Sequence, residues 1–267
     1  MHKGSKVELN FIVFNMRFTH LFFLLYIGVF FSCKQSHLQL TKIEAKRIDV
    51  NDSLLVDSKI EAFINPFRER INKDLDSVLS YSVGTFSKTD GALNTAIGNY
   101  MADAVYDEAN PIFKNRTGYD IDMVLLNHGG IRSILSKGNI TKRTAFELMP
   151  FENSIVVVAL QKPQIDSLII YLSKAKRAHP ISKLKLTLDN DFEILEAKIK
   201  GNDINPNKTY YVATNDYLYN GGDNMTFFKT NDSLYVLDYK IRTALIDNFM
   251  KNDTINPVRD DRFLQIN

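Results

Sequence analysis

Four short stretches of the sequence carry residue types that bind ligands, and long gaps separate them. They are NHGGIR at 127–132, PFEN at 150–153, Tyr217, and GGD at 221–223. In the first, an apolar run that predicts a strand is followed by a glycine turn and then by Arg132. The turn would bring Arg132 back to the end of the strand, where a ligand could bind. The ordinary alternative is a strand-to-turn exit with a surface arginine, because Gly-Gly and Pro-Phe pairs are common in turns. The combination of the four stretches indicates a ligand site.

Alternating helices and strands are predicted to position these stretches, which lie at strand ends or in turns, where binding residues are usually found. Two nearly continuous apolar runs are typical of strands covered on both faces, and apolar residues at helical spacing predict helices between the strands. The predicted helices are 57–77, 93–108 (with Thr89 and Asp90 as its N-cap), 163–172 and 238–250, and the predicted strands are 81–86, 121–126, 154–161, 184–188, 192–200 and 210–214. This order predicts the α/β (α+β) class, with helices layered on a mixed β-sheet.

The first 33 residues have the pattern of a bacterial lipoprotein signal. An eleven-residue apolar run at 21–31 is too short to cross a bilayer comfortably but has the length of a signal-peptide core. A serine follows it, and then comes Cys33, the only cysteine, which we expect to become the lipidated N-terminus. Phe30 stands where such signals usually have leucine, and a single transmembrane anchor is the alternative. Translation can begin at Met16, because a signal does not need the residues before it.

Residues 34–56 are polar and mixed in charge, so we expect a tether with at most one short strand near 38–48. Residues 57–267 have the length of one domain, and with a single cysteine no internal disulfide can stabilise it. The net charge is +2 and no long basic run occurs, so the chain lacks the electrostatic footprint of a nucleic-acid-binding protein. We expect it in the cell envelope, periplasmic or at the outer membrane, with a small-molecule ligand.

Together, the four stretches resemble the C-terminal, substrate-binding domain of the 5′-nucleotidases, a family that includes the UDP-sugar hydrolases and the ecto-5′-nucleotidase. That domain carries an Asn-Gly-Gly-Gly-Ile-Arg motif, a Gly-x-Ile-Thr stretch, Pro-Phe-x-Asn, and an aromatic residue four positions ahead of Gly-Gly-Asp. Here these read NHGGIR, GNIT at 138–141, PFEN, and YLYNGGD at 217–223. Segments 97–104 (IGNYMADA), 201–218 and 240–249 also match, so the resemblance extends from about residue 60 to the C-terminus.

The resemblance implies a nucleoside or nucleotide ligand, such as adenosine or AMP, and a role for each motif. Phe151 and Tyr217 would hold the base between two aromatic rings, and stacking of this kind tolerates different bases. Asn127 can offer its amide to a base edge. Arg132 can offer a planar guanidinium to ribose oxygens or phosphate, and Asp223 can accept from ribose hydroxyls.

The remaining implied substrate-binding residues are Asn153 of the PFEN motif and the glycine pair Gly221 and Gly222, which bring the following aspartate close. The sequence also departs from the family pattern. His128 replaces a small residue in the glycine turn, and Lys88 is the only cation where the family has arginines before its second helix. Asn224 stands where a glycine is common, and Tyr217 replaces the usual phenylalanine.

The metal ligands of the two-domain 5′-nucleotidases have no counterpart in the mature sequence. Those proteins hold two metal ions in an N-terminal metallophosphatase domain, where the ions clamp phosphate and activate water. Of the five histidines here, only His128 and His179 lie beyond the tether. Asp120 and Asp122 would begin the strand that His128 follows, about 20 Å away at roughly 3.3 Å per residue. We therefore expect no metal and no cofactor in this chain.

Three functions are consistent with this pattern. The chain could be the substrate-binding part of a 5′-nucleotidase-type hydrolase whose metallophosphatase, with its divalent metals, is a separate chain. It could instead be a non-catalytic nucleoside-binding lipoprotein, or a self-sufficient enzyme with unfamiliar chemistry. We expect the first, in which the chain alone has no activity on nucleotides.

Overall fold

The computed structural model describes residues 40–51 and 54–266, and the chain divides into two units at residue 57. The signal and the lipidation site predicted at 1–33 lie outside the described residues. Residues 40–51 form neither a helix nor a strand, so the short strand expected near 38–48 is absent from its described part. Within the described residues, no helix is both long and apolar enough to cross a membrane.

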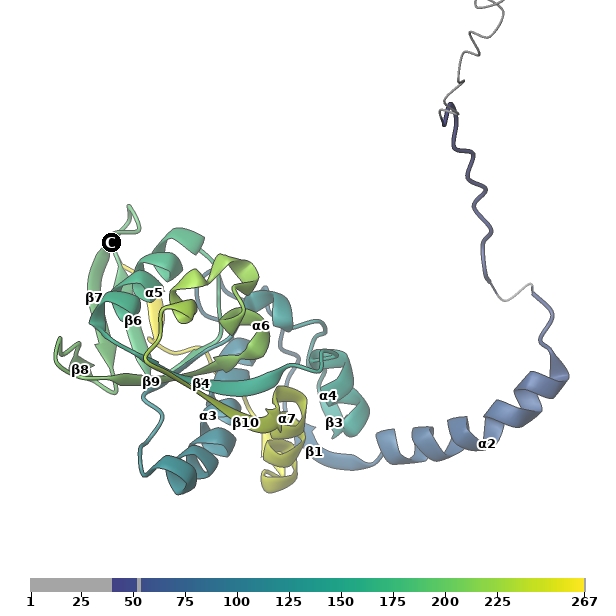
Figure 1. The fold of residues 1–267 in the computed structure, drawn as a ribbon. Coiled ribbons are helices and arrows are strands. Elements are labelled where there is room, and N and C mark those ends of the chain that lie inside the picture. The colour runs from purple at the N-terminus through teal and green to yellow at the C-terminus, as the bar shows by residue number, and fades with distance from the viewer. Residues whose placement is uncertain (1–39, 52–53, 267) are drawn as a thin grey trace, which may run out of the picture. The chain divides into compact units, whose positions relative to one another are not determined.

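A mixed five-stranded sheet forms the centre of the domain at 57–267 (Figure 1). In sheet order its strands are β10 (Ser233–Lys240), β4 (Ser154–Leu160), β9 (Tyr210–Asn215), β2 (Met123–Leu125) and β5 (Ile181–Ser182). Only β2 and β9 pair in parallel, and the other three pairs are antiparallel. The predicted class and the mixed sheet are therefore confirmed.

The two faces of this sheet contact different helices, as the alternation of side chains along β4 requires. Ile155 and Val157 pack in a core with α3 (Ala96–Thr117) and α7 (Ile241–Lys251). Val156 and Val158 pack in a second core with α5 (Lys162–Ala175). Apolar residues face both ways along this strand because helices cover both sides, which explains its unbroken apolar sequence.

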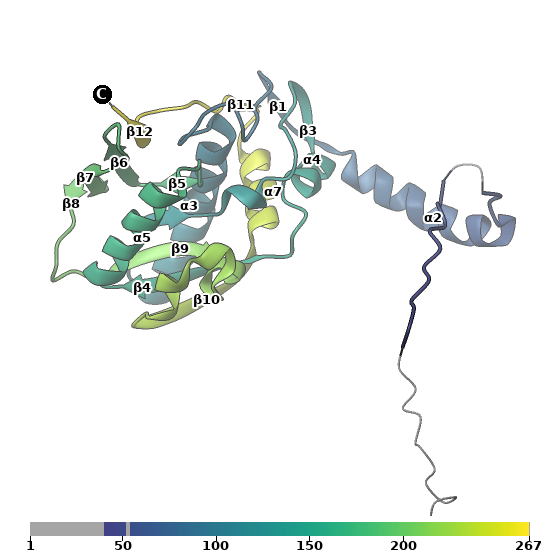
Figure 2. The same cartoon turned by 90° about the horizontal axis from the view of Figure 1, so that it is seen from above.

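Two smaller sheets flank the central one. The first has the order β11 (Thr254–Ile255), β1 (Val78–Ser82), β3 (Gly138–Thr141), and the second has the order β12 (Phe263–Gln265), β6 (Leu184–Leu188), β7 (Ile194–Ile199), β8 (Asn202–Asp203). The short helical elements are α4 (Lys142–Leu148), α6 (Asp216–Tyr219), and the 3-10 turns η1 (His128–Gly130), η2 (Gly222–Asn224) and η3 (Thr226–Lys229). The first long helix, α2 (Ser58–Leu75), extends away from the sheets in both views (Figure 1, Figure 2).

Several predicted boundaries are wrong. The helix expected at 93–108 begins at Ala96 with Thr95 as its N-cap, rather than Thr89 or Asp90, and continues to Thr117. The strand expected at 81–86 is β1, which ends at Ser82. The helix expected from 238 begins only at Ile241, after a strand.

Candidate functional site

Strand order brings the predicted site residues to one end of the central sheet. β2 and β9 run parallel, and β4 runs antiparallel to β9. The ends of β2 and β9 therefore lie at the same edge as the start of β4. Asn127 follows β2, Tyr217 follows β9, and Asn153 precedes β4. Motifs that are far apart in the sequence meet because these three strands are neighbours.

These residues line one cavity of about 330 Å³. Its lining residues are Asn127, Gly129, Arg132, Phe151, Asn153, Tyr217 and Asp223. Six of the eight residues expected to bind substrate are in this set, and the cavity is within the size range of small-molecule sites. Gly221 and Gly222 do not line it. They shape the loop that carries Asp223.

Two half-exposed aromatic rings belong to this cavity. Phe151 is 41% exposed and Tyr217 is 45% exposed, although aromatic side chains of this size gain most when they are buried. The guanidinium carbon of Arg132 lies 5.8 Å from the centre of the Phe151 ring, within the range of a cation–π contact. A cavity with two open rings and a cation can hold a flat group by stacking.

Gly222 is required by its contact with Tyr217. A Cβ atom at position 222 would lie 2.4 Å from the Tyr217 ring, closer than carbon atoms can approach. The preceding residue, Gly221, has φ +94°, which glycine adopts without strain. The two glycines therefore let the loop fold directly onto the aromatic ring.

Two tyrosines hold Asp223 in place, one through its carboxylate and one through its main-chain carbonyl. The Tyr217 hydroxyl donates to Asp223 Oδ1 at 2.9 Å, and the Tyr171 hydroxyl donates to the Asp223 carbonyl at 2.9 Å. The hydrogen bond to Asp223 raises the pKa of Tyr217 above its ordinary value. Asp223 has φ +50°, a left-handed conformation that is uncommon outside glycine. The tyrosine hydroxyl that departs from the family pattern thus orients the carboxylate.

Asn127 is buried beneath the cavity and bound from one side only. Its Oδ1 accepts from Asn215 Nδ2 at 3.4 Å, and Asn215 Oδ1 in turn caps α6 by accepting from Leu218 N at 2.7 Å. Among the described residues, no hydrogen bond involves Asn127 Nδ2. The amide can therefore donate to a ligand while its position is fixed through α6, the helix that carries Tyr217.

Two histidines hold the glycine turn. The backbone N–H of His128 donates to His179 Nδ1 at 3.4 Å, and His128 Nδ1 lies 3.1 Å from the Ala178 carbonyl oxygen. Burial lowers the pKa of His179 to about 4, so this imidazole is neutral at pH 7 and can accept. Lys88 Nζ donates to the Ile131 carbonyl at 2.8 Å. It supports the same loop and does not line the cavity.

Arg242 fixes the loop that carries Phe151. This arginine of α7 is buried, and its Nη1 lies within 3.4 Å of the carbonyl oxygens of Met149, Pro150 and Phe151. It also forms an ion pair with Glu152. Arg242 lies in segment 240–249, which resembles the family. The local sequence around it did not predict this contact with Glu152, which lies 90 residues away in the chain.

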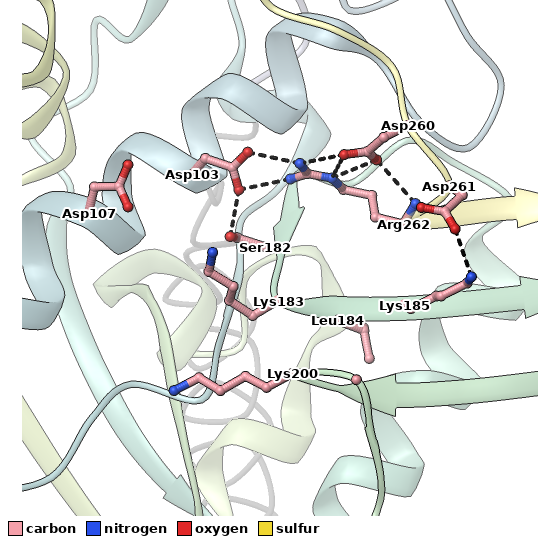
Figure 3. Close-up of a pocket in the computed structure, with 11 residues that line it drawn as sticks. Asp103, Asp107, Ser182, Lys183, Leu184, Lys185, Lys200, Asp260, Asp261 and Arg262 are labelled. Carbon is pink, nitrogen blue, oxygen red and sulfur yellow. Dashed lines mark hydrogen bonds and ion pairs between the residues drawn. The ribbon is translucent and has the colours of Figure 1, made fainter.

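A charged cavity elsewhere contains none of the predicted site residues (Figure 3). There Asp103 accepts from both terminal nitrogens of Arg262 at 2.9 and 2.8 Å, and from Ser182 Oγ at 2.6 Å. Arg262 also pairs with Asp260. These bonds tie the C-terminal segment to α3 and β5, so the aspartate of the IGNYMADA motif has a structural role.

The side chains do not form a metal site in the part of the chain that the structure describes. There, no three His, Cys, Asp or Glu side chains are close enough to hold an ion together. Asp120 instead accepts from Asn110 and Lys114, and Asp122 pairs with Lys208 at 2.6 Å. The two metal ions of the family's phosphatase domain do not fit these residues, and we assign no metal-dependent step to them.

Comparisons with known proteins agree with this geometry. The family model "5′-nucleotidase, C-terminal domain" matches residues 78–230. The cell wall protein Lmo0130 of Listeria monocytogenes is 30% identical over 73% of this chain and 26% of its own length. The trifunctional nucleotide phosphoesterase protein YfkN of Bacillus subtilis is 31% identical over 74% of this chain and 15% of its own.

The fold is also found in a solved structure. A 5′-nucleotidase precursor from Thermus thermophilus superposes with a TM-score of 0.64 and 19% identity, covering 78% of this chain and 43% of the other. This chain spans less than half the length of each of these proteins. With the family model matched over more than half of its residues, this chain belongs to the 5′-nucleotidase C-terminal domain family.

Proposed function

We propose that this chain is the substrate-specificity part of a 5′-nucleotidase-type phosphoester hydrolase, acting in nucleotide catabolism, whose metallophosphatase domain is a separate chain. The observation that carries the proposal is the pair of half-exposed rings, Phe151 and Tyr217, on one cavity. A base would stack between them, a contact worth roughly 1–3 kcal/mol per base. The free amide nitrogen of Asn127 would read the base edge.

The polar groups of the cavity would bind the rest of a nucleotide. Asp223, oriented by the Tyr217 hydroxyl, would accept from ribose hydroxyls. Arg132 lies beside the Phe151 ring and would donate to ribose oxygens or to a phosphate, which a guanidinium can bind through two parallel hydrogen bonds. These groups bind and orient, and none of them supplies a nucleophile for phosphate transfer.

A partner chain is proposed because the described residues form no metal cluster. Separating the two domains gives up the high effective concentration that a covalent linker provides. A stable interface, or anchoring of both chains to one membrane, would have to replace it.

We also propose that lipidated Cys33 anchors the chain in the cell envelope. The relative named as a cell wall protein supports an extracytoplasmic location. A Cys33→Ser variant is expected to leave the membrane fraction. If that variant stays membrane-bound and uncleaved, the apolar run at 21–31 is instead a transmembrane anchor.

Phosphate release from AMP tests whether the hydrolase is divided between this chain and a separate metallophosphatase chain. It is measured for this chain alone, for a candidate compact metallophosphatase from the same organism, and for the mixture. We expect no release from this chain with or without divalent metal, and more from the mixture than from the partner alone. Arg132→Ala or Asp223→Ala should reduce the gain.

Two results would contradict the proposal. Activity of this chain alone that survives repurification would make it a self-sufficient enzyme. A mixture no faster than the partner alone would favour a non-catalytic nucleoside-binding lipoprotein.

A further inference from the structure

A second cavity lies beside the nucleoside cavity and shares one residue with it. Its volume is about 500 Å³. It is lined by Tyr171, Lys174, Arg177, His179, Asp223 and Asn224. Asp223 also lines the nucleoside cavity, so a ligand group that reaches the Asp223 carboxylate lies at the boundary between the two cavities.

The turn at this boundary is fixed by side-chain contacts. Asp223 has φ +50° and Asn224 has φ +61°, left-handed conformations that are uncommon outside glycine. Two successive residues of this kind persist only where surrounding contacts hold them, and such residues cluster at ligand sites. Here the Tyr171 hydroxyl donates to the Asp223 carbonyl and the Tyr217 hydroxyl donates to Asp223 Oδ1. The boundary between the cavities is therefore a rigid turn that carries a carboxylate.

The opposite wall of the second cavity, at residues 177–179, is also fixed. His179 is 5% exposed, and its backbone N–H donates to the Arg177 carbonyl at 2.8 Å. Its Nδ1 accepts from the His128 backbone N–H, and His128 Nδ1 lies 3.1 Å from the Ala178 carbonyl oxygen. The main chain at Arg177 is therefore held by the same glycine turn that borders the nucleoside cavity.

The charges of the second cavity favour an anion. Lys174 lies in the last turn of α5, and Arg177 lies past the end of that helix. Neither forms an ion pair with any residue that the structure describes, and Asp223 is the one carboxylate among the lining residues. Because His179 is neutral at pH 7, the cavity has two cations against one carboxylate. A guanidinium can bind a phosphoryl group through two parallel hydrogen bonds, and an ammonium binds it as a point charge.

We propose that the second cavity binds a phosphoryl group carried on the 2′ or 3′ oxygen of a ribose whose base occupies the nucleoside cavity. The proposal rests on the nucleoside-binding part of the proposed function and needs no partner chain. Asp223 accepts from the remaining ribose hydroxyl at the boundary, and the phosphoryl oxygens extend past the turn to Arg177 and Lys174. The ligand class is a ribonucleotide phosphorylated at this side of the sugar, whether or not it also carries a 5′-phosphate.

Calorimetric titration of the full chain at low ionic strength tests the proposal, because exposed charges are screened least there. The ligands are adenosine, 5′-AMP, 2′-AMP and 3′-AMP. We expect 2′-AMP or 3′-AMP to bind about tenfold more tightly than adenosine, which corresponds to one hydrogen bond to a charged group. Arg177→Gln should abolish this gain and leave the ratio of 5′-AMP to adenosine affinity unchanged. Arg177 is exposed, so the variant should fold.

The matched control is Lys176→Gln, which removes one positive charge from the adjacent position. Lys176 does not line the second cavity, and its ammonium lies 3.8 Å from the centre of the Phe192 ring. This variant should bind all four ligands as wild type does.

Two results would overturn the proposal while the nucleoside-binding role stands. The first is a wild-type chain that binds adenosine but binds neither 2′-AMP nor 3′-AMP more tightly. The second is an equal loss of affinity in Arg177→Gln and Lys176→Gln, which would reduce the effect to the net charge of the chain. Failure of the wild-type chain to bind any of the four ligands would remove the nucleoside-binding role as well.

Discussion

At the cavity, single residues are placed by contacts that also prepare them for a ligand. The Tyr217 ring lies against Gly222, and its hydroxyl binds Asp223 Oδ1. Asp223 is therefore oriented without a ligand, which would lower the entropy lost in the proposed binding of a nucleoside. Its second carboxylate oxygen has no hydrogen bond within the described residues, so it can accept from a hydroxyl group.

Replacing Tyr217 by phenylalanine should separate stacking from this orienting role. The ring would remain, while one hydrogen bond worth roughly 0.5–1.5 kcal/mol would be lost. We expect adenosine to bind a few-fold more weakly in calorimetric titration. The affinity for 2′,3′-dideoxyadenosine should stay the same, because that ligand lacks the 2′ and 3′ hydroxyls that Asp223 would bind. Equal losses for both ligands would show that the hydroxyl does not act through the carboxylate.

His179 should make the stability of the domain depend on pH. Its pKa falls from an ordinary value of 6.5 to about 4 on folding, so below pH 6.5 the unfolded chain binds a proton that the folded chain does not. The contribution is complete above pH 6.5 and is lost as the pH falls to 4, by about 3 kcal/mol at most. Denaturant unfolding of wild type and His179→Phe measures it. We expect a shallower decline for the variant, and identical slopes would refute the assignment.

At the scale of elements, runs of apolar residues correctly predicted the buried strands. Element boundaries that depend on long-range contacts could not be predicted from the local sequence. The runs at 121–126 and 154–161 form buried strands because both sheet faces are covered. The strand β10 was missed because it is an edge strand whose alternation breaks where Asp238 adopts φ +54°. The helix α3 continues through Pro111 because Phe113, beyond it, is fully buried.

The candidate site also contains residues that the sequence predicted and residues that it did not. Its lining residues were predicted from motifs, because each motif is a short local stretch that the sequence displays directly. The residues that hold them, Tyr171, His179 and Arg242, were not predicted as supports. Each acts through a hydrogen bond to a loop at least 50 residues away in the sequence, and such contacts leave no local spacing pattern.

Arg242→Met should release the Phe151 loop. Hydrogen bonds from a charged group contribute roughly 1.5–3 kcal/mol, and the free energy of unfolding should fall by about that amount. Amide exchange at 151–153 should become faster. Arg116→Met is the control, since Arg116 also donates to two main-chain carbonyls but is exposed, and we expect it to cost less than 1 kcal/mol. Equal losses for the two variants would contradict the special role of Arg242.

At the scale of the whole molecule, the domain presents two open surfaces. One is the cavity with its paired rings, and the other is the apolar side of α2, where Phe63 and Phe67 are 71% and 60% exposed. Under the proposed function a partner would cover the cavity during catalysis, since water exclusion strengthens the electrostatic interactions of an active site.

The central claim is that Phe151 and Tyr217 hold a nucleobase, and titration of the full chain with adenosine tests it most directly. Wild type should bind, and Phe151→Ala and Tyr217→Ala should each lose roughly 1–3 kcal/mol, which is about 5- to 150-fold in Kd. Leu195→Ala, an exposed residue distant in the fold, should bind as wild type does. Saturable binding of adenosine with the same Kd in wild type and both aromatic variants would contradict the claim.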